Sequence, residues 1–414
     1  MRRTVIGAAA MTAILLAACG STSNSGSAVA SSGSAAAASS TPLRIAAIPV
    51  QTGALAAYGK AALQADEFAA AQANASGGVD GHKVVLVPEQ TTGTPASTLS
   101  AARRAVEQSG AHFITSIMTD PEQLALYPQL STLNAIDINT LSTADQDNGS
   151  SCNASAFRVV PGNSMVMTSV AQVLKTLPAK SWDILAEDYD VGHNNAQVFS
   201  AAATKIGDTV NKQLFSPLGT SDFGSYISQL KGTSSDGLLL VEYGTDASSF
   251  ITQAAQFGLL GKYKSIIGID TLNDPLLPAV GKNALGIYET VDWAASLNNP
   301  LNNAFVANWQ KQYGSIPYYV EADNYLGMQA IFHAVDQAKS INPAAVQKAL
   351  RNLSFNSIVG QVTFNPQDNQ MERPQYIVQV VKGNIAAGLG WKIVDTVPAS
   401  ASIAANSACH MSGS

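Results

Sequence analysis

Polar and aromatic side chains follow the ends of the apolar runs in this sequence, where they could together hold a small molecule. Six segments have this position, namely residues 51–58, 119–120, 142–143, 187–192, 242–243 and 270–271. In open α/β sheets, ligands bind just beyond the carboxyl ends of parallel strands. Hydroxyls, carboxylates and rings at such an edge would hydrogen-bond a small polar solute and hold it between aromatic faces. Loops are polar in most proteins, however, so each segment taken alone fits a solvated surface equally well.

Residue patterns typical of catalysis or metal binding are sparse. The sequence contains no nucleophile elbow, phosphate-binding loop or dinucleotide fingerprint. Glu187, Asp188 and Asp190 could act as an acid–base group, but they directly follow a predicted strand, which favours a binding loop or a solvated loop. The histidines lack Cys or carboxylate partners at ligand spacing, so we expect surface or core roles for them. We therefore predict a protein that is not an enzyme and has no cofactor or metal.

Alternating strands and helices position the polar segments. From Leu43 to about Pro398, strand-like apolar runs alternate with amphipathic helical runs, which predicts α/β layering with parallel strands. The plan of residues 44–141 repeats over residues 182–269, so we predict two similar lobes. The C-terminal part of the chain differs from this parallel plan, because residues 376–381 and 391–394 are predicted to form an antiparallel pair of strands.

A glycine-rich corner lies between the helix predicted over residues 60–74 and the strand predicted over 84–87. Gly77, Gly78 and Gly81 fall within five residues of one another there. Glycine is the residue that adopts positive φ without steric cost. The pattern therefore predicts one tight helix-to-strand turn.

Length and charge exclude some classes of protein. A chain of 414 residues that is 46% hydrophobic fits two domains of ordinary size better than one. Only 13% of residues are charged, the net charge is −6, and no Lys/Arg cluster occurs beyond the first three residues. A nucleic-acid partner is therefore not expected.

The N-terminus has the pattern of a lipoprotein export signal. Arg2 and Arg3 precede an apolar segment, residues 5–18, that is too short to be a good membrane span. The segment ends in a lipobox at Cys19, which predicts a signal peptide over residues 1–18 and acylation of Cys19; a plain signal peptide that contains a cysteine is the alternative. Residues 19–42 are predicted to form a flexible Ser/Ala-rich tether, and residues 399–414 a loose tail.

Two further cysteines, Cys152 and Cys409, lie in the part of the chain that such a signal would export to an oxidising compartment. A disulfide between them and two unpaired thiols are both compatible with the spacing.

The corner from Asn74 to Lys83 resembles the helix-turn-strand signature of the branched-chain amino-acid-type (leucine/isoleucine/valine-binding-like) periplasmic binding proteins. Further similarities follow in the family's order at residues 52–59, at Pro95 and the helix after it, at Phe157-Arg158, and at residues 221–231, 253–259 and 268–270. The resemblance extends from Leu43 to about Val397.

This resemblance implies a type I periplasmic binding protein fold, with two Rossmann-like lobes and a three-segment hinge near Pro161, Asp292 and Gly360. Lobe one would comprise residues 43–160 and 294–359, and lobe two residues 161–293 and 360–398. A solute binds between the lobes, which close on it for recognition by a membrane permease. We expect a monomeric solute receptor of an ABC importer that contacts the membrane only through its acyl anchor. A sensory module that signals to a membrane partner is the alternative.

The resemblance also implies a ligand site. Tyr58, Thr143, Tyr243 and Asp270 match the family's binding chemistry, with Asp270 in place of a glutamate that meets the ligand ammonium. Thr119 and Ser142 lie beside matched positions. Two loops depart from the family pattern: Asp120 stands where the family has a serine for the ligand carboxylate, and Val191 stands where it has an aromatic residue that Tyr189 could replace.

An amino acid or similar small polar nitrogen compound is the expected solute. The acidic residues Asp120 and Asp270 make an amide, urea or amine the alternative, because an ionised aspartate would repel a ligand carboxylate.

Overall fold

The computed structural model describes residues 41–402 and 406–411. The predicted signal peptide, Cys19 and nearly all of the predicted tether lie outside these residues. Two α/β lobes, which belong to the same compact unit of the chain, are built around separate sheets. Among the described residues, no helix combines the length and apolar character needed to cross a membrane.

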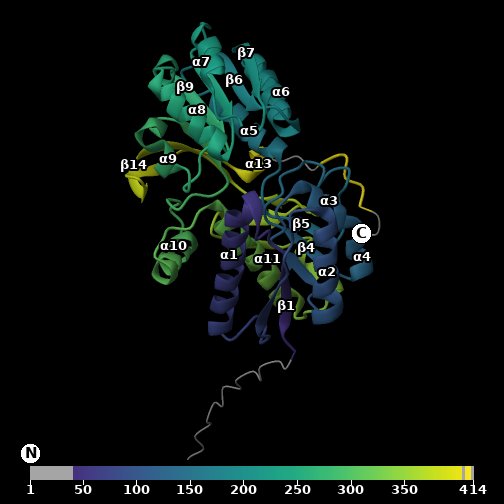
Figure 1. Cartoon of the computed structure of the whole chain (residues 1–414). Helices are drawn as coiled ribbons and strands as arrows, with labels where there is room; N and C mark the ends of the chain where they lie inside the picture. Colours follow the sequence, from purple (N-terminus) through teal and green to yellow (C-terminus); the bar gives the residue numbers. More distant parts are fainter. Residues whose placement is uncertain (1–40, 403–405, 412–414) are drawn as a thin grey trace, which may run out of the picture. The chain divides into compact units, whose positions relative to one another are not determined.

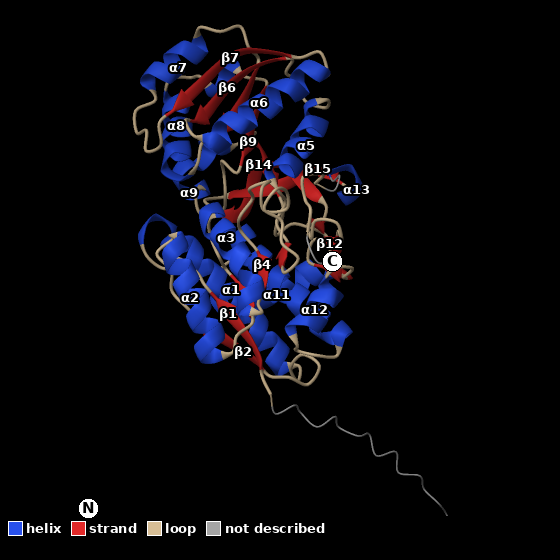
Figure 2. Ribbon diagram, turned by 90° about the vertical axis from the view of Figure 1, so that its right-hand side faces the viewer, coloured by secondary structure: helices blue, strands red, loops and turns tan. Residues whose placement is uncertain are grey.

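The sheet of lobe one has five parallel strands in the order β2-β1-β3-β4-β5. Their bounds are β1 Leu43–Ala47, β2 Val84–Pro88, β3 Phe113–Thr115, β4 Ile136–Asn139 and β5 Ala156–Arg158. The helices that connect them are α1 Ala56–Ala75, α2 Pro95–Ser109, α3 Asp120–Leu126 and α4 Leu130–Leu133. Figures 1 and 2 show these helices around the sheet.

Lobe two repeats this strand order as β7-β6-β8-β9-β10 and extends it at the β10 edge with two antiparallel strands, β14 and β15. The strands are β6 Ser181–Glu187, β7 Thr209–Ser216, β8 Gly237–Val241, β9 Ser265–Ile269, β10 Tyr288–Val291, β14 Gln375–Ala386 and β15 Leu389–Val397. Its helices are α5 Asn163–Leu174, α6 Asp190–Lys205, α7 Gly224–Lys231, α8 Gly244–Gln256 and α9 Leu277–Val280. The predicted α/β architecture and the predicted antiparallel pair are confirmed.

The alternation of side chains along β1 explains the layers of lobe one. Leu43 and Ile45 share a buried cluster with Phe68 of α1, whereas Ala46 belongs to another cluster with Ala102 of α2. Successive strand residues face opposite sides of a sheet, so each face of β1 buries a different helix. Small residues on both sides allow the α2 backbone to approach the sheet closely.

The glycine corner has the predicted conformation. Gly77, Gly78 and Gly81 have φ values of 98°, 90° and 78°. A Cβ on Gly78 would lie 2.3 Å from the main-chain oxygen of His82, so this position excludes larger residues by contact as well as by φ.

Three helices from the C-terminal third of the chain and a small sheet complete lobe one. The helices are α10 Pro300–Tyr313, α11 Tyr319–Ala338 and α12 Pro343–Leu350, and the antiparallel sheet contains β11 Ser354–Ser357, β12 Gly360–Phe364 and β13 Met371–Glu372. The ring of Phe364 lies 5.4 Å from that of Phe157, and the Arg158 amide donates to the Asn369 carbonyl at 3.1 Å. Residues 360–372 thus pack on lobe one, and we propose that the third crossing lies at Arg373 instead of Gly360.

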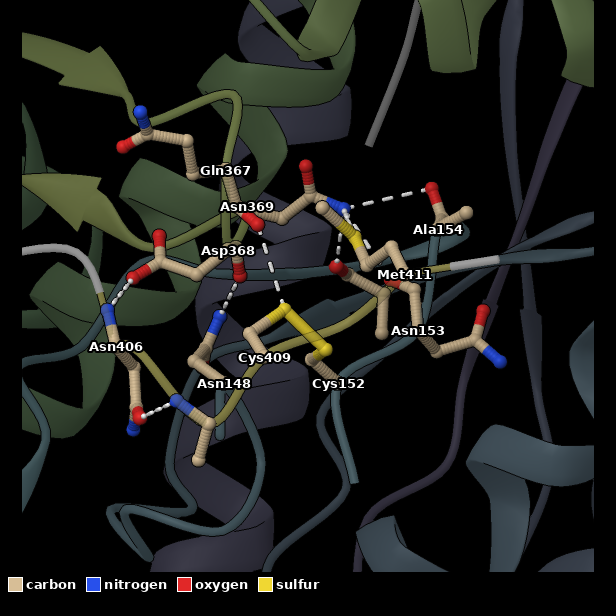
Figure 3. Close-up of a disulfide and its surroundings, with 12 residues drawn as sticks. Asn148, Cys152, Asn153, Ala154, Gln367, Asp368, Asn369, Asn406, Cys409 and Met411 are labelled. Carbon is tan, nitrogen blue, oxygen red and sulfur yellow. Dashed lines mark hydrogen bonds between the residues drawn. A yellow bond between two sulfur atoms is a disulfide. The ribbon is translucent and has the colours of Figure 1, made fainter. Parts of the chain in front are cut away.

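The end of the C-terminal segment is attached to lobe one, whereas helix α13 lies against α5 of lobe two. Cys152 and Cys409 form a disulfide with their Cα atoms 5.5 Å apart, as Figure 3 shows. Next to it, the Asn406 amide donates to Asp368 Oδ2 at 2.8 Å. The described parts of this segment, α13 Ala399–Ser402 and residues 406–411, therefore differ from the predicted loose tail.

Candidate functional site

A cavity of about 380 Å³ has walls from both lobes. Tyr58 and Asp120 belong to lobe one, whereas Tyr189 and Tyr243 belong to lobe two. The segments that cross between the lobes also line it, through Pro161, Asp292 and Gln375 among others. This volume is in the range of cavities that hold small molecules.

The structure brings nearly all of the predicted ligand residues to this cavity. Its lining includes Tyr58, Thr119, Asp120, Thr143, Tyr189, Val191, Tyr243 and Asp270. Their contact with a solute remains a prediction. The exception is Ser142, which is buried behind the wall.

Ser142 holds Asp120 in place instead of lining the cavity. Its hydroxyl makes a short hydrogen bond to Asp120 Oδ1 and lies 2.6 Å from Asp147 Oδ2. One hydroxyl proton cannot be donated fully to two carboxylates, so protonation of one of these carboxyls would strengthen the pair of contacts. Burial raises the pKa of Asp147 to about 6, against the opposing effects of Arg158 and Ser142, which favours Asp147 as the protonated partner.

In both lobes, a tightly packed glycine near the start of a helix places a tyrosine at the cavity. The helix that follows the first strand of each lobe carries a glycine in its first turn: Gly59 in α1, after β1, and Gly192 in α6, after β6. A Cβ on Gly59 would lie 1.8 Å from the Val50 carbonyl oxygen, and one on Gly192 would lie 2.0 Å from that of Glu187. These close approaches fix the helix starts, and with them the cavity positions of Tyr58 and Tyr189.

Four aspartates line the cavity: Asp120, Asp270, Asp292 and Asp323. No Lys, Arg or His occurs among the described residues that line it. The side chain of Asp270 is exposed to the open cavity, while the cavity walls of both lobes bury the space around it. This burial, with the nearby charge of Asp292, raises the pKa of Asp270 to about 7.

Asp323 is the only one of these aspartates with a charged partner among the described residues. The buried Arg373 donates to Asp323 Oδ1 at 2.7 Å, and also to the main-chain oxygens of Val159 at 3.1 Å and Asp292 at 2.6 Å. Val159 and Asp292 belong to the other two crossing segments. Arg373 therefore ties all three segments together behind the cavity.

Several lining residues were missed from the sequence: Thr140, Asn273, Thr290, Asp292, Tyr319, Asp323 and Gln375. Most of them do not follow a strand of the repeated plan, so the strand-end rule could not find them. Tyr319 and Asp323 carried a usable signal, because residues four apart share one face of a helix.

One group of carboxylates has the composition of a metal site. Ligand oxygens of Glu187, Glu242 and Asp246 lie within 4.8 Å of one another. Each already has a protein donor: Glu242 accepts from Ser216 at 2.6 Å, Glu187 from the Tyr243 amide at 2.9 Å, and Asp246 from the Gly219 amide at 2.7 Å. Burial raises the pKa of Glu242 to about 8, so it is mostly protonated at neutral pH. Each carboxyl thus has at least one donor of its own, and Glu242 Oε2 has no hydrogen-bond partner among the described residues.

The buried Glu242 carboxyl makes stability depend on pH. Between the normal glutamate pKa and about 8, unfolding releases its proton, so we expect stability to fall as the pH rises through this window. Glu242→Gln, which mimics the protonated acid, should raise the free energy of unfolding by about 4 kcal/mol at pH 8 and by less than about 1 kcal/mol at pH 5. Urea denaturation at both pH values measures this. The exposed Glu107→Gln is the matched control, and an equal gain at pH 5 would contradict the argument.

Comparison with known proteins agrees with this geometry. Residues 42–384 match the sequence model of the family described as periplasmic binding protein. The chain belongs to the periplasmic binding protein family. Its fold and relatives identify the branched-chain amino-acid type, whose members are solute-binding proteins and not enzymes. Membership in this family implies a location outside the cytoplasm.

Individual relatives are distant but cover most of the chain. Leu/Ile/Val-binding protein homolog 8 of Brucella abortus is 26% identical over 376 residues, which cover 85% of this chain and 90% of the relative. The closed leucine-, isoleucine-, valine-, threonine- and alanine-binding protein of Brucella ovis has a TM-score of 0.81 at 20% identity, with 90% and 99% of the two chains covered. A solute-binding protein of Rhodopseudomonas palustris in complex with 3,4-dihydroxybenzoic acid has a TM-score of 0.77 at 20% identity, with 86% and 98% covered.

Proposed function

We propose that this chain is the solute-binding component of an ABC importer, held by a lipid at Cys19 on the outer side of a bacterial cell membrane. It captures an amino acid or a similar small polar nitrogen compound between its two lobes. The observation that carries the proposal is the cavity whose walls are divided between the lobes. Closure about the crossing segments would enclose a solute and create the form that a permease recognises.

The named relatives support a transport role and leave the ligand open. The Brucella ovis protein is named for aliphatic amino acids and threonine, whereas the Rhodopseudomonas palustris protein holds an aromatic acid. Ligand identity therefore has to come from the side chains of this cavity.

Thermal shift of the mature protein against amino acids, amides, ureas and amines tests solute binding. A ligand bound only by the folded state raises the melting temperature with its concentration. We expect at least one of these classes to do so, with calorimetry giving one site per chain. If millimolar concentrations of all four classes leave the melting temperature unchanged, the proposed function is wrong.

Tyr243 should contribute strongly to solute binding. Its ring lines the cavity 6.5 Å from the ring of Tyr189, so the two can contact one solute. We expect Tyr243→Ala to weaken binding by about 1–3 kcal/mol, measured by calorimetry. Tyr243→Phe, which keeps the ring, should lose much less; an equal loss in both variants would show that the hydroxyl matters and the ring does not.

The proposed lipid anchor has a direct test in cells. Cys19→Ser removes the acylated thiol, so the variant should move from the membrane fraction to the soluble extracytoplasmic fraction. Cys409→Ser, which leaves Cys19 intact, is the control and should stay with the membrane. Persistent membrane association of Cys19→Ser would refute the anchor.

A further inference from the structure

We propose that the solute is a small organic cation whose charged centre bears N–H groups (an ammonium, amidinium or guanidinium) and that carries no carboxylate. This inference rests on the proposed solute-binding function and narrows it to one class of ligand. It is carried by the charges, the rings and the unpaired polar atoms of the cavity wall.

Apart from the tyrosines, every titratable side chain of the wall is a carboxyl. Asp120, Asp270, Asp292 and Asp323 line the cavity, and no described lining residue is a Lys, Arg or His. Arg373, the partner of Asp323, is fully buried, and its bonded donors face Asp323 and two main-chain oxygens. A ligand carboxylate would therefore meet like charges in a partly dehydrated space without a side-chain cation to offset them.

Four tyrosines share the same wall: Tyr58, Tyr189, Tyr243 and Tyr319. Burial raises the pKa of each phenol, so all four are uncharged at physiological pH. The faces of neutral aromatic rings attract organic cations, and more strongly when the cation is dehydrated. The tyrosine rings and the aspartate carboxylates of the wall thus both favour a positively charged ligand.

Three buried polar atoms of the wall have no hydrogen-bond partner within the described chain: Asp323 Oδ2, Thr290 Oγ1 and Gln375 Nε2. Their side chains are at least nine-tenths buried, so leaving these atoms unpaired is costly. Asp323 Oδ2 and Thr290 Oγ1 can accept N–H groups of a cation, but neither atom has open surface in this structure, so a side-chain rotation has to expose them first. Gln375 Nε2 is a donor, which requires an uncharged acceptor, such as an amide oxygen, elsewhere on the solute.

A series of near-isosteric compounds tests the charge requirement. Leucinamide, leucine, 4-methylpentanamide and 4-methylpentanoate differ in their charged groups but hardly in shape, and benzylamine, benzamide and benzoate form a second series. Calorimetry should show the cation of at least one series binding ten-fold or more tightly than its neutral, zwitterionic or anionic counterparts. Equal or tighter binding of leucine or of a carboxylate would overturn the inference while supporting solute binding. Failure of both leucinamide and benzylamine to bind at 10 mM would also overturn the inference. The thermal-shift test with amino acids, amides, ureas and amines decides the proposed solute-binding function separately.

Charge-removing variants show whether the wall aspartates cause the preference. Asp270→Asn should lower the affinity ratio of the preferred cation to its neutral amide ten-fold or more, mainly through loss of cation binding. Asp120→Asn, in the other lobe, should also lower this affinity ratio. It replaces Asp270→Asn in the test if Asp270→Asn does not fold. Asp188→Asn removes an exposed carboxylate outside the cavity wall and should leave the ratio unchanged. An unchanged ratio in the folded cavity variants would overturn the inference.

Discussion

We expect Arg373→Met to lower the free energy of unfolding by about 3–5 kcal/mol, because it removes one partner of a fully buried ion pair. Both side chains are almost inaccessible, at 0% and 1% exposure, so water cannot replace the lost hydrogen bond to Asp323. The variant also loses the bonds to Val159 and Asp292, which connect the third crossing segment to the other two. Urea denaturation at pH 7 measures the loss.

Two comparisons isolate the buried pair. Arg104→Met breaks an ion pair with Glu89 at 2.9 Å, but the Arg104 side chain is 41% exposed, so about 1 kcal/mol or less should be lost. The double variant Arg373→Met/Asp323→Leu removes the uncompensated carboxylate and should recover part of the stability. If the double variant is as unstable as the sum of both single variants, the cost comes from packing and not from an unpaired charge.

The repeated α/β plan was predictable because buried parallel strands are short apolar runs that differ sharply from the helices between them. The lobe-one strand around Ile114 and the lobe-two strand around Leu239 both have this pattern. The position that we propose for the third crossing differs from the predicted one for a related reason. Gly360–Phe364 has the pattern of a strand, but a local pattern does not say which sheet a strand joins. Its partners, β11 and β13, are short and have weak sequence signals.

The cavity was predicted where it is built from loops after strands, and missed where it is built from hinge segments and from α11. Tyr58 and Tyr243 follow strands of the repeated plan, so their positions could be predicted from chain order. Asp292 and Gln375 reach the cavity only because the crossing segments meet there, which depends on tertiary contacts such as those of Arg373. Sequence patterns thus pointed to two acidic residues of the cavity wall, Asp120 and Asp270, but not to the other two, Asp292 and Asp323.

Gly59 is the second position where we expect a large effect. A Cβ there would lie 1.8 Å from the Val50 carbonyl oxygen, a main-chain atom that cannot move aside without shifting the segment after β1. Gly59→Ala should therefore cost about 3 kcal/mol or more, at the upper end of overpacking substitutions, although alanine is the better helix former. Gly261→Ala is the matched control: its φ is not positive and no atom lies within 4 Å of its Cβ position, so little change is expected.

The same substitution should also weaken solute binding, because the first turn of α1 carries Tyr58 into the cavity next to Gly59. The two effects have different causes. The loss of stability comes from the contact with Val50, and the loss of affinity comes from the displaced ring of Tyr58. Urea denaturation and calorimetry on the same preparation measure both. If Gly59→Ala is as stable as Gly261→Ala, the close approach of α1 to Val50 does not exist in solution.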